Sequence, residues 1–317
     1  MLQVEPTARH LVPLPEARGL LGPFHRPLPT FDFVCLGARD KDWNPKPSED
    51  RIVITSQLVA VVDGATSVDP TLTYHGLNAA QFAAEHLRRF CLKNAGRYAS
   101  AADVLVEANT AFGRILRRAD PEPDFAAGPS ASAALVMFHP NGQFDVAACC
   151  DCIVCARRAD GRWEQLTCDL LPQARVTLKN AVNPDEPGIG DLARATRLRS
   201  LSDPRFRRAF LYNQHIAVMN GDPKFGTEPG LLQYRPKLPL DQYSMIVIMS
   251  DGAFYPNFVV GESPALATCF RLEKLNFSPR RVAWEIFTLK EQARSLDLGG
   301  KAFDDLTLLA ITIPEQI

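Results

Sequence analysis

The sequence lacks a long apolar run. None of its 317 residues belongs to a stretch of about 18 consecutive apolar residues, so we expect no membrane-spanning helix. The N-terminal segment contains glutamate, arginine and several prolines where a signal peptide needs an apolar core. We therefore expect a cytoplasmic protein.

An excess of charge of either sign is also missing. The formal net charge is −1 and the isoelectric point is about 6.6, so bulk electrostatics do not favour nucleic acid as a partner. Hydrophobic residues make up 46% and charged residues 22% of the chain, which is ordinary for a globular protein. The length is sufficient for one large domain or two small ones.

No second cysteine pair lies near the cysteine-rich segment at residues 149–155. Four of the eight cysteines lie between Cys149 and Cys155, and their C-x-x-C spacing suggests zinc or redox chemistry. In a strand, however, Cys149 and Cys152 would face opposite sides, and Cys168 and His139 lie across hairpins. We interpret these cysteines as buried, reduced side chains that pack as small apolar residues.

The most informative stretch is a run of small apolar residues that stops at Asp63-Gly64. Residues 58–62 are apolar on both faces, which indicates a strand buried on both sides with a carboxylate at its end. Residues 245–250 run into Asp251-Gly252 in the same way. The glycine in each pair allows a sharp turn and a close backbone approach.

Two further acidic pairs lie at strand ends. Glu49-Asp50 precedes the apolar residues 51–54, and Asp304-Asp305 precedes 306–313. Any one of the four clusters is explained by an ordinary turn. Four of them indicate carboxylates that converge on hard cations.

Periodicity predicts one mixed α and β domain. Residues 1–30 are expected to form an extended arm, and residues 31–317 a domain with an irregular, flap-like insertion at about 171–240. Strands are expected at 31–36, 51–55, 58–62, 131–138, 144–150, 153–157, 163–167, 242–250 and 306–313. Helices are expected at 73–90, at about 191–199 and 204–211, and after Ser263-Pro264 and Ser278-Pro279. Another helix is expected to begin at Ser100, with a buried face formed by Leu105, Ala108, Phe112 and Ile115.

The motifs in this order resemble the metal-dependent protein phosphatases, the PPM or type-2C family, and in particular their compact bacterial branch. Acidic residues 49–50, VVDG, the small-residue strand GPSASAA, an aspartate-containing hairpin, IVIMSDG and DDLT follow one another over residues 31–313. The resemblance implies an α+β fold, a four-layer α-β-β-α sandwich with two central antiparallel sheets.

The resemblance also implies roles for the acidic residues in holding two Mg²⁺ or Mn²⁺ ions. Asp63 resembles the carboxylate that bridges the ions, and the backbone carbonyl of Gly64 resembles a ligand of the second ion. Asp251 and Asp304 resemble ligands of the first ion, with Asp305 an open alternative to Asp304. Glu49 and Asp50 resemble an acidic pair, one a ligand and the other orienting water. The implied catalytic set is Asp63, Asp251, Asp304 and Asp50.

The sequence departs from the family where substrate is bound. A histidine often follows the Asp-Gly turn, but here the residue is Ala65, and the next histidine, His75, is more simply a surface residue. Pro45 stands where many members have a phosphate-binding arginine. The nearby cations that could replace it are Lys46, Arg39 and Lys41, although lysine offers a point charge without a bidentate fork.

Other departures concern a third ion and the insertion. Asp151 resembles a ligand of the family's third metal, but Tyr255 stands where its partner would be, so two ions are expected. Residues 208–222, with Asn213 and Asn220, resemble a bacterial segment that contains an arginine and an asparagine. Ordinary turn chemistry explains the same residues.

The resulting functional hypothesis is a phosphoserine/phosphothreonine protein phosphatase that uses water activated by two metal ions. One alternative is a catalytically weak or inactive PPM-like module that regulates or binds a partner. A second is hydrolysis of a small phosphorylated metabolite, because a fold does not settle the substrate. A monomer is the simplest expectation, while regulation and physiological substrate stay open.

Overall fold

The computed structural model describes residues 29–38, 46–66, 68–69, 71–256, 263–295 and 304–314. The expected N-terminal arm up to residue 28, Arg39, Lys41, Pro45 and the loop at 298–301 lie outside these residues. No helix within the described ranges is long and apolar enough to cross a membrane.

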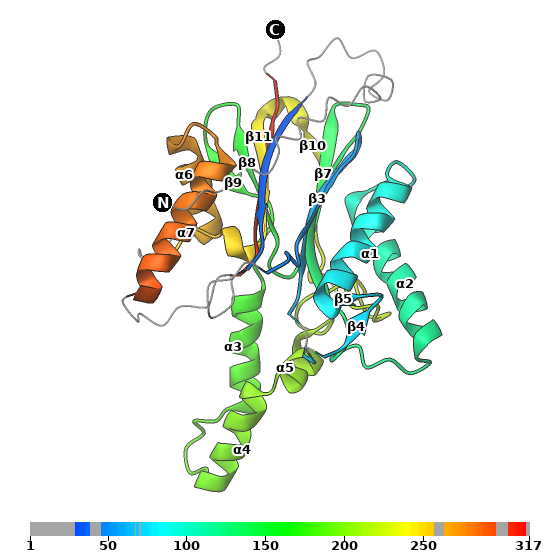
Figure 1. Ribbon diagram of the computed structural model, residues 1–317, viewed down its shortest axis with the longest axis vertical. Helices are drawn as coiled ribbons and strands as arrows, with labels where there is room; N and C mark the ends of the chain where they lie inside the picture. Colours follow the sequence, from blue (N-terminus) through cyan, green and yellow to red (C-terminus); the bar gives the residue numbers. More distant parts are fainter. Residues whose placement is uncertain are drawn as a thin grey trace.

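Two antiparallel sheets form the centre of the molecule (Figure 1). Within the described residues each has five strands. The first has the order β10-β7-β6-β3-β2, with bounds Gln233–Pro239, Gln143–Cys149, Ala131–Phe138, Leu58–Gly64 and Arg51–Ile54. The second has the order β1-β12-β11-β8-β9, with bounds Thr30–Leu36, Leu306–Thr312, Tyr243–Met249, Ile153–Arg158 and Trp163–Gln165.

Strand β3 shows why the apolar run is continuous. Val59 and Val61 pack between the two sheets with Ile246 of β11, whereas Ala60 and Val62 point to the helical layer on the other side. Both faces of the strand are therefore buried, as the sequence predicts. The strand lies in register between β2 and β6, with Asp63 opposite Ser132.

A pair of helices covers the outer face of each sheet. Helices α1 (Ala79–Asn94) and α2 (Ala101–Ala119) cover the first sheet, and α6 (Pro264–Lys274) and α7 (Pro279–Ser295) cover the second (Figure 1). Separate apolar clusters fill the space between sheet and helices and between the sheets. The predicted four-layer α-β-β-α sandwich is confirmed.

The first helix begins later than its periodicity predicts. Residues 73–78 form a small hairpin, β4 (Thr73–Tyr74) and β5 (Leu77–Asn78), around a turn at His75-Gly76. Both turn residues have positive φ, and Asn78 then caps α1 in a capping box with Gln81.

One residue of the second helix is also misplaced by periodicity. Ser100 does cap α2, as predicted, and accepts the Asp103 backbone N–H. Ile115 was expected on the buried face but is 39% exposed, and Leu116 is buried in its place.

The expected irregular insertion at 171–240 contains three helices in its first part. Helices α3 (Leu171–Val182), α4 (Asp191–Ser202) and α5 (Pro204–Leu211) form an arm that projects from one end of the sandwich (Figure 1). Helices α4 and α5 match the expected short helices, while α3 and strand β10 were not predicted. Helix α4 has no buried residue, whereas Ala174, Leu178 and Leu211 of α3 and α5 anchor the base of the arm.

The cysteine-rich segment is the crossing between the two sheets. Strand β7 ends at Cys149 in the first sheet and β8 begins at Ile153 in the second, with Cys150 at positive φ between them. The four cysteines between 149 and 155 are buried and free, and each joins a different apolar cluster. This arrangement fits their interpretation as small packing residues.

Candidate functional site

Acidic side chains from both sheets meet at one end of the sandwich. Asp63 ends β3 in the first sheet, while Asp251 follows β11 and Asp304 precedes β12 in the second. Burial raises the pKa of Asp63 well above its usual value. The nearby carboxylates raise it further, namely Asp50, Asp151, Asp251 and Asp304. The sequence-predicted acids therefore surround one central carboxylate.

Asp50 is the most buried of these acids at 2% exposure. Its Oδ2 accepts a hydrogen bond of 2.9 Å from the Ser250 hydroxyl, while no described residue donates to its Oδ1. Burial, followed by the charge of Asp305, raises the pKa of Asp50 from 3.8 to about 7. A buried carboxylate oxygen without a donor indicates a place for a cation or a water molecule.

Ser250 joins the acidic ends of three strands. Its hydroxyl accepts the backbone N–H of Thr307 at 3.0 Å while it donates to Asp50, and its backbone N–H donates to Thr307. Ser250 thus links the end of β11 to Asp50, which precedes β2, and to Thr307 at the start of β12. Sequence analysis did not identify Ser250, although it directly precedes an Asp-Gly pair.

The acidic pair 304–305 divides into two roles. Asp305 is 4% exposed, and its two carboxylate oxygens accept the backbone N–H groups of Ala38 and Glu49, each at 2.5 Å. Asp305 therefore ties the segments flanking residues 39–45 to β12. This use of both oxygens favours Asp304 as the metal ligand, which stays a prediction.

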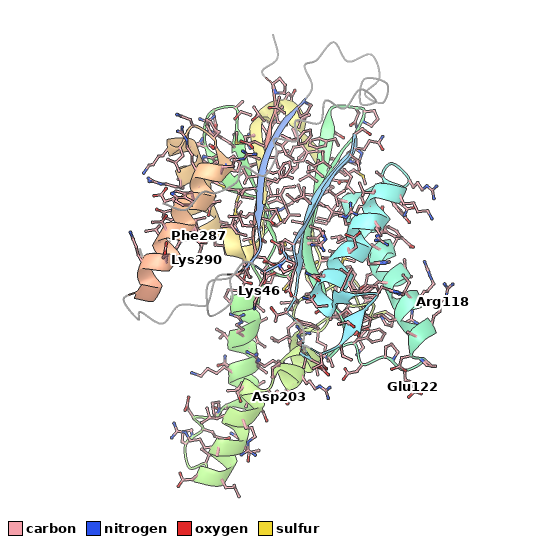
Figure 2. The ribbon with its side chains drawn as sticks, viewed as in Figure 1. Lys46, Arg118, Glu122, Asp203, Phe287 and Lys290 are labelled. Atoms are coloured by element: carbon pink, nitrogen blue, oxygen red, sulfur yellow. The ribbon has the colours of Figure 1, made fainter. Side chains whose placement is uncertain are left out.

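Glu49 lies at the edge of the same group. Its Oε1 accepts a hydrogen bond of 2.7 Å from the side chain of Asn78, the residue that caps α1. Burial raises the pKa of Glu49, and the charges of Asp305 and Asp304 add to the effect while Lys46 opposes it. Lys46 is exposed and lies at this end of the sandwich, near the base of α3 (Figure 2).

The two glycines that follow the site aspartates are required by close backbone contacts. A Cβ on Gly252 would lie 1.7 Å from the carbonyl oxygen of Asp305, and one on Gly64 would lie 2.7 Å from that of Ala80. Each Asp-Gly pair therefore places its aspartate where two backbones touch. The predicted role of the Gly64 carbonyl as a metal ligand stays a prediction.

Two cationic side chains contact the loops that carry the aspartates. The Lys290 ammonium of α7 donates to the Gly252 carbonyl at 2.9 Å (Figure 2). The Arg208 guanidinium of α5 donates through Nη2 to the Thr66 carbonyl, and its buried Nη1 has no partner among the described residues. Sequence analysis missed Lys290, because a lysine on an amphipathic helix gives no signal of its own. Arg208 is the first residue of the segment 208–222, which sequence analysis did single out.

The remaining residues of that segment have structural roles. The Asn213 and Asn220 side chains bond to each other at 2.9 Å, and Asn109 of α2 accepts the backbone N–H groups of Asn220 and Gly221. His75 is exposed at the tip of the β4–β5 hairpin, where it contacts Phe82. These contacts agree with the simpler interpretation of each residue.

Asp151 lies beside Asp63, on the turn between the sheets. Donor atoms of Asp63, Asp151 and Cys152 all lie within 4.8 Å of one another. Sequence analysis missed Asp169, which precedes α3. Its charge adds to burial in raising the pKa of Asp151. Burial, followed by the charge of Asp251, raises the pKa of Asp169 itself. Tyr255 bonds through its hydroxyl to Glu285 of α7 at 3.1 Å, so it is held by the helix.

The donor set fits hard divalent cations. Apart from the Cys152 thiol, its groups are carboxylates, which are the preferred ligands of Mg²⁺ and Mn²⁺. Burial and the charges of neighbouring acids raise the pKa of Asp63 and Asp50, and a bound cation would offset that repulsion. An unpartnered oxygen on Asp50 points to the same conclusion.

The fold is that of the PPM serine/threonine phosphatases. The chain is similar to PstP/Ppp of Mycobacterium tuberculosis at 16% identity and a TM-score of 0.53, with 92% of this chain and 100% of that chain covered. It is similar to MsPP of Mycobacterium smegmatis at 17% and 0.51, covering 90% and 98%. For Stp1 of Staphylococcus aureus the values are 13% and 0.52, covering 91% and 96%.

One of these relatives has been solved with metal. The catalytic domain of PstP, which matches at 16% identity and a TM-score of 0.51 over 91% of this chain and 99% of that one, is in complex with two manganese ions. No family model matches this sequence, and no curated protein does. The likeness therefore establishes the fold.

Proposed function

We propose that this protein is a metal-dependent phosphatase that hydrolyses phosphoserine and phosphothreonine on proteins. The observation that carries the proposal is the convergence of carboxyl groups from both sheets around Asp63. The fold shared with bacterial serine/threonine phosphatases supports the substrate class.

Asp63, Asp251 and Asp304 are the side chains that would hold two ions, together with Glu49 and the Gly64 carbonyl. Bound Mg²⁺ or Mn²⁺ supplies a nucleophilic water at neutral pH and neutralises charge on phosphate oxygens. The chain must keep four carboxylates close together in the absence of that charge. Ser250, Lys290 and the Asp305 hydrogen bonds hold the loops that carry them.

The other residues of the site position water and substrate. Asp50 offers a fixed acceptor, Oδ1, that can orient a water molecule because Ser250 holds the opposite oxygen. Lys46 at the rim and Arg208, whose buried Nη1 has no partner among the described residues, are the candidates to bind a phosphate group, while Arg39 lies outside the described residues and stays a prediction. Arg208 has the fork geometry that lysine lacks, so we rank it first.

The test compares the unmodified protein with Asp251→Asn and a matched control, Asp241→Asn. Asp241 is exposed and lies beyond the opposite end of the same strand. Hydrolysis of p-nitrophenyl phosphate and of phosphoserine and phosphothreonine peptides is measured with Mn²⁺, with Mg²⁺ and with a chelator. We expect Mn²⁺-dependent turnover that falls by at least about 100-fold in Asp251→Asn and is unchanged in Asp241→Asn.

Two other outcomes would contradict the proposal. Mn²⁺ binding by calorimetry without turnover on any substrate would favour a regulatory or binding module. Turnover that the chelator and Asp251→Asn leave intact would place the chemistry elsewhere in the chain.

A further inference from the structure

Cys152 lies within the acidic cluster, although it was expected only to fill space. Its sulfur and one oxygen each from Asp63 and Asp151 lie within 4.8 Å of one another. Cys152 is fully buried, and the Ser132 hydroxyl lies 3.4 Å from its sulfur. The crossing turn between β7 and β8 creates this juxtaposition, because it brings Cys152 beside Ser132 of β6, which is the residue opposite Asp63 of β3.

A sulfur donor changes which cation a site prefers. Thiolate ligands favour zinc and similar borderline-soft ions, whereas Mg²⁺ takes oxygen alone. Ligand atoms around tetrahedral zinc are about 3.5 Å apart, given bonds of about 2.0–2.3 Å. The three donors would therefore have to move together by about 1 Å.

A second observation, on the neighbouring acid Asp50, also points to a cation in this region. Asp50 is 2% exposed, its Oδ1 has no donor among the described residues, and its charge acts on both Asp63 and Cys152. The group thus offers a thiol and two carboxylates, and Asp50, with its unsatisfied buried oxygen, lies close enough for its charge to act on two of them.

We infer that Cys152, Asp63 and Asp151 form a binding site for zinc or a similar borderline-soft divalent cation. On binding, the sulfur–metal bond forms and the Cys152 thiol proton leaves to solvent, with no change of oxidation state. Because Asp63 is shared with the proposed catalytic site, zinc at this site excludes Mg²⁺ or Mn²⁺ from the central carboxylate. The inference uses Asp63 but does not depend on phosphatase activity.

The first test is X-ray absorption at the zinc edge on the unmodified protein loaded with one equivalent of Zn²⁺. We expect one sulfur at about 2.3 Å and otherwise oxygen in the first shell. A shell of oxygen or nitrogen alone would overturn the inference, and so would more than one sulfur. This measurement requires no variant and therefore does not depend on how any substitution folds.

The second test uses Co²⁺ as a spectroscopic probe. Thiolate ligation gives a charge-transfer band in the near ultraviolet, which we expect in the unmodified protein and in Cys149→Ser. The band should be lost in both Cys152→Ser and Cys152→Ala. Cys149 is a matched control because it is equally buried, three residues away, and faces a different apolar cluster.

A band that persists in Cys152→Ser, or that disappears in Cys149→Ser, would refute the assignment to Cys152. We also expect zinc inhibition of Mn²⁺-dependent turnover to weaken by about 10-fold or more in Cys152→Ser. The zinc-edge and Co²⁺ results stand if the protein proves to have no turnover, so failure of this inference and of the proposed phosphatase function are distinguishable.

Discussion

Asp50 shows most clearly that burying acids at this site lowers the stability of the metal-free protein. It is an acid with almost no exposure that accepts from the Ser250 hydroxyl and is surrounded by other acids. Burial in such surroundings disfavours the charged form, which explains a pKa of about 7. The free energy of unfolding of the metal-free protein must therefore depend on pH.

The sign follows from the direction of the shift. Between pH 3.8 and about 7 the folded protein holds the Asp50 proton more tightly than the unfolded chain, so stability falls as pH rises through this window. We predict that Asp50→Asn raises the unfolding temperature of the chelator-treated protein at pH 8 and leaves it unchanged near pH 3.5. Calorimetry at several pH values would measure this, with Asp241→Asn as control. A variant less stable than the parent at pH 8 would contradict the prediction.

Some residue roles were readable from the sequence and others were not. Asp63 and Asp251 were identifiable because each ends a run of apolar residues, a local signal. The division between Asp304 and Asp305 was not, because it depends on amide donors from Ala38 and Glu49, more than 250 positions away in the chain. Lys290 was not identifiable because a lysine on an amphipathic helix gives no signal of its own.

At the scale of elements, the Asp251-Gly252 turn lies against the residue before β12 more closely than any other described glycine lies against its neighbours. We predict that Gly252→Ala lowers the free energy of unfolding by roughly 2 kcal/mol or more, because its Cβ would collide with the backbone oxygen of Asp305. Chemical denaturation would measure the loss. Gly190→Ala, at the N-cap of the exposed helix α4 where a Cβ has nothing within 4 Å, should lower it by no more than about 1 kcal/mol. Equal effects at both positions would show that the close contact is unimportant.

The strands were predicted better than the first helix and the arm. Two buried sheets give long apolar runs with clear ends, so β3, β6, β11 and β12 were visible. Residues 73–78 look helical because Leu77 continues the periodicity of α1, yet His75-Gly76 forces a hairpin. Strand β10 was missed because it lies at the edge of its sheet and is mostly exposed, so it lacks an apolar pattern.

At the scale of the molecule, each sheet contributes part of the acidic cluster. Ions that bind there would link the two layers and remove the repulsion between them. We predict that Mn²⁺ at about 100 times its dissociation constant stabilises the protein by about 2.7 kcal/mol. Calorimetry should show a rise in unfolding temperature that Asp251→Asn largely abolishes and that Asp241→Asn retains. A metal-independent unfolding temperature in the parent protein would argue against the site.

The exposed helix α4 of the arm affects how the sequence of such a protein can evolve. Helix α4 buries none of its side chains, and Leu192 is 84% exposed on it. Substitutions on α4 therefore cost the sandwich little stability, although the base of the arm adjoins the acidic cluster through Asp169. Natural variation can accumulate on α4 while selection holds the rest of the fold constant. Lineages that share this sandwich are thus free to diverge first in the surface that the arm presents.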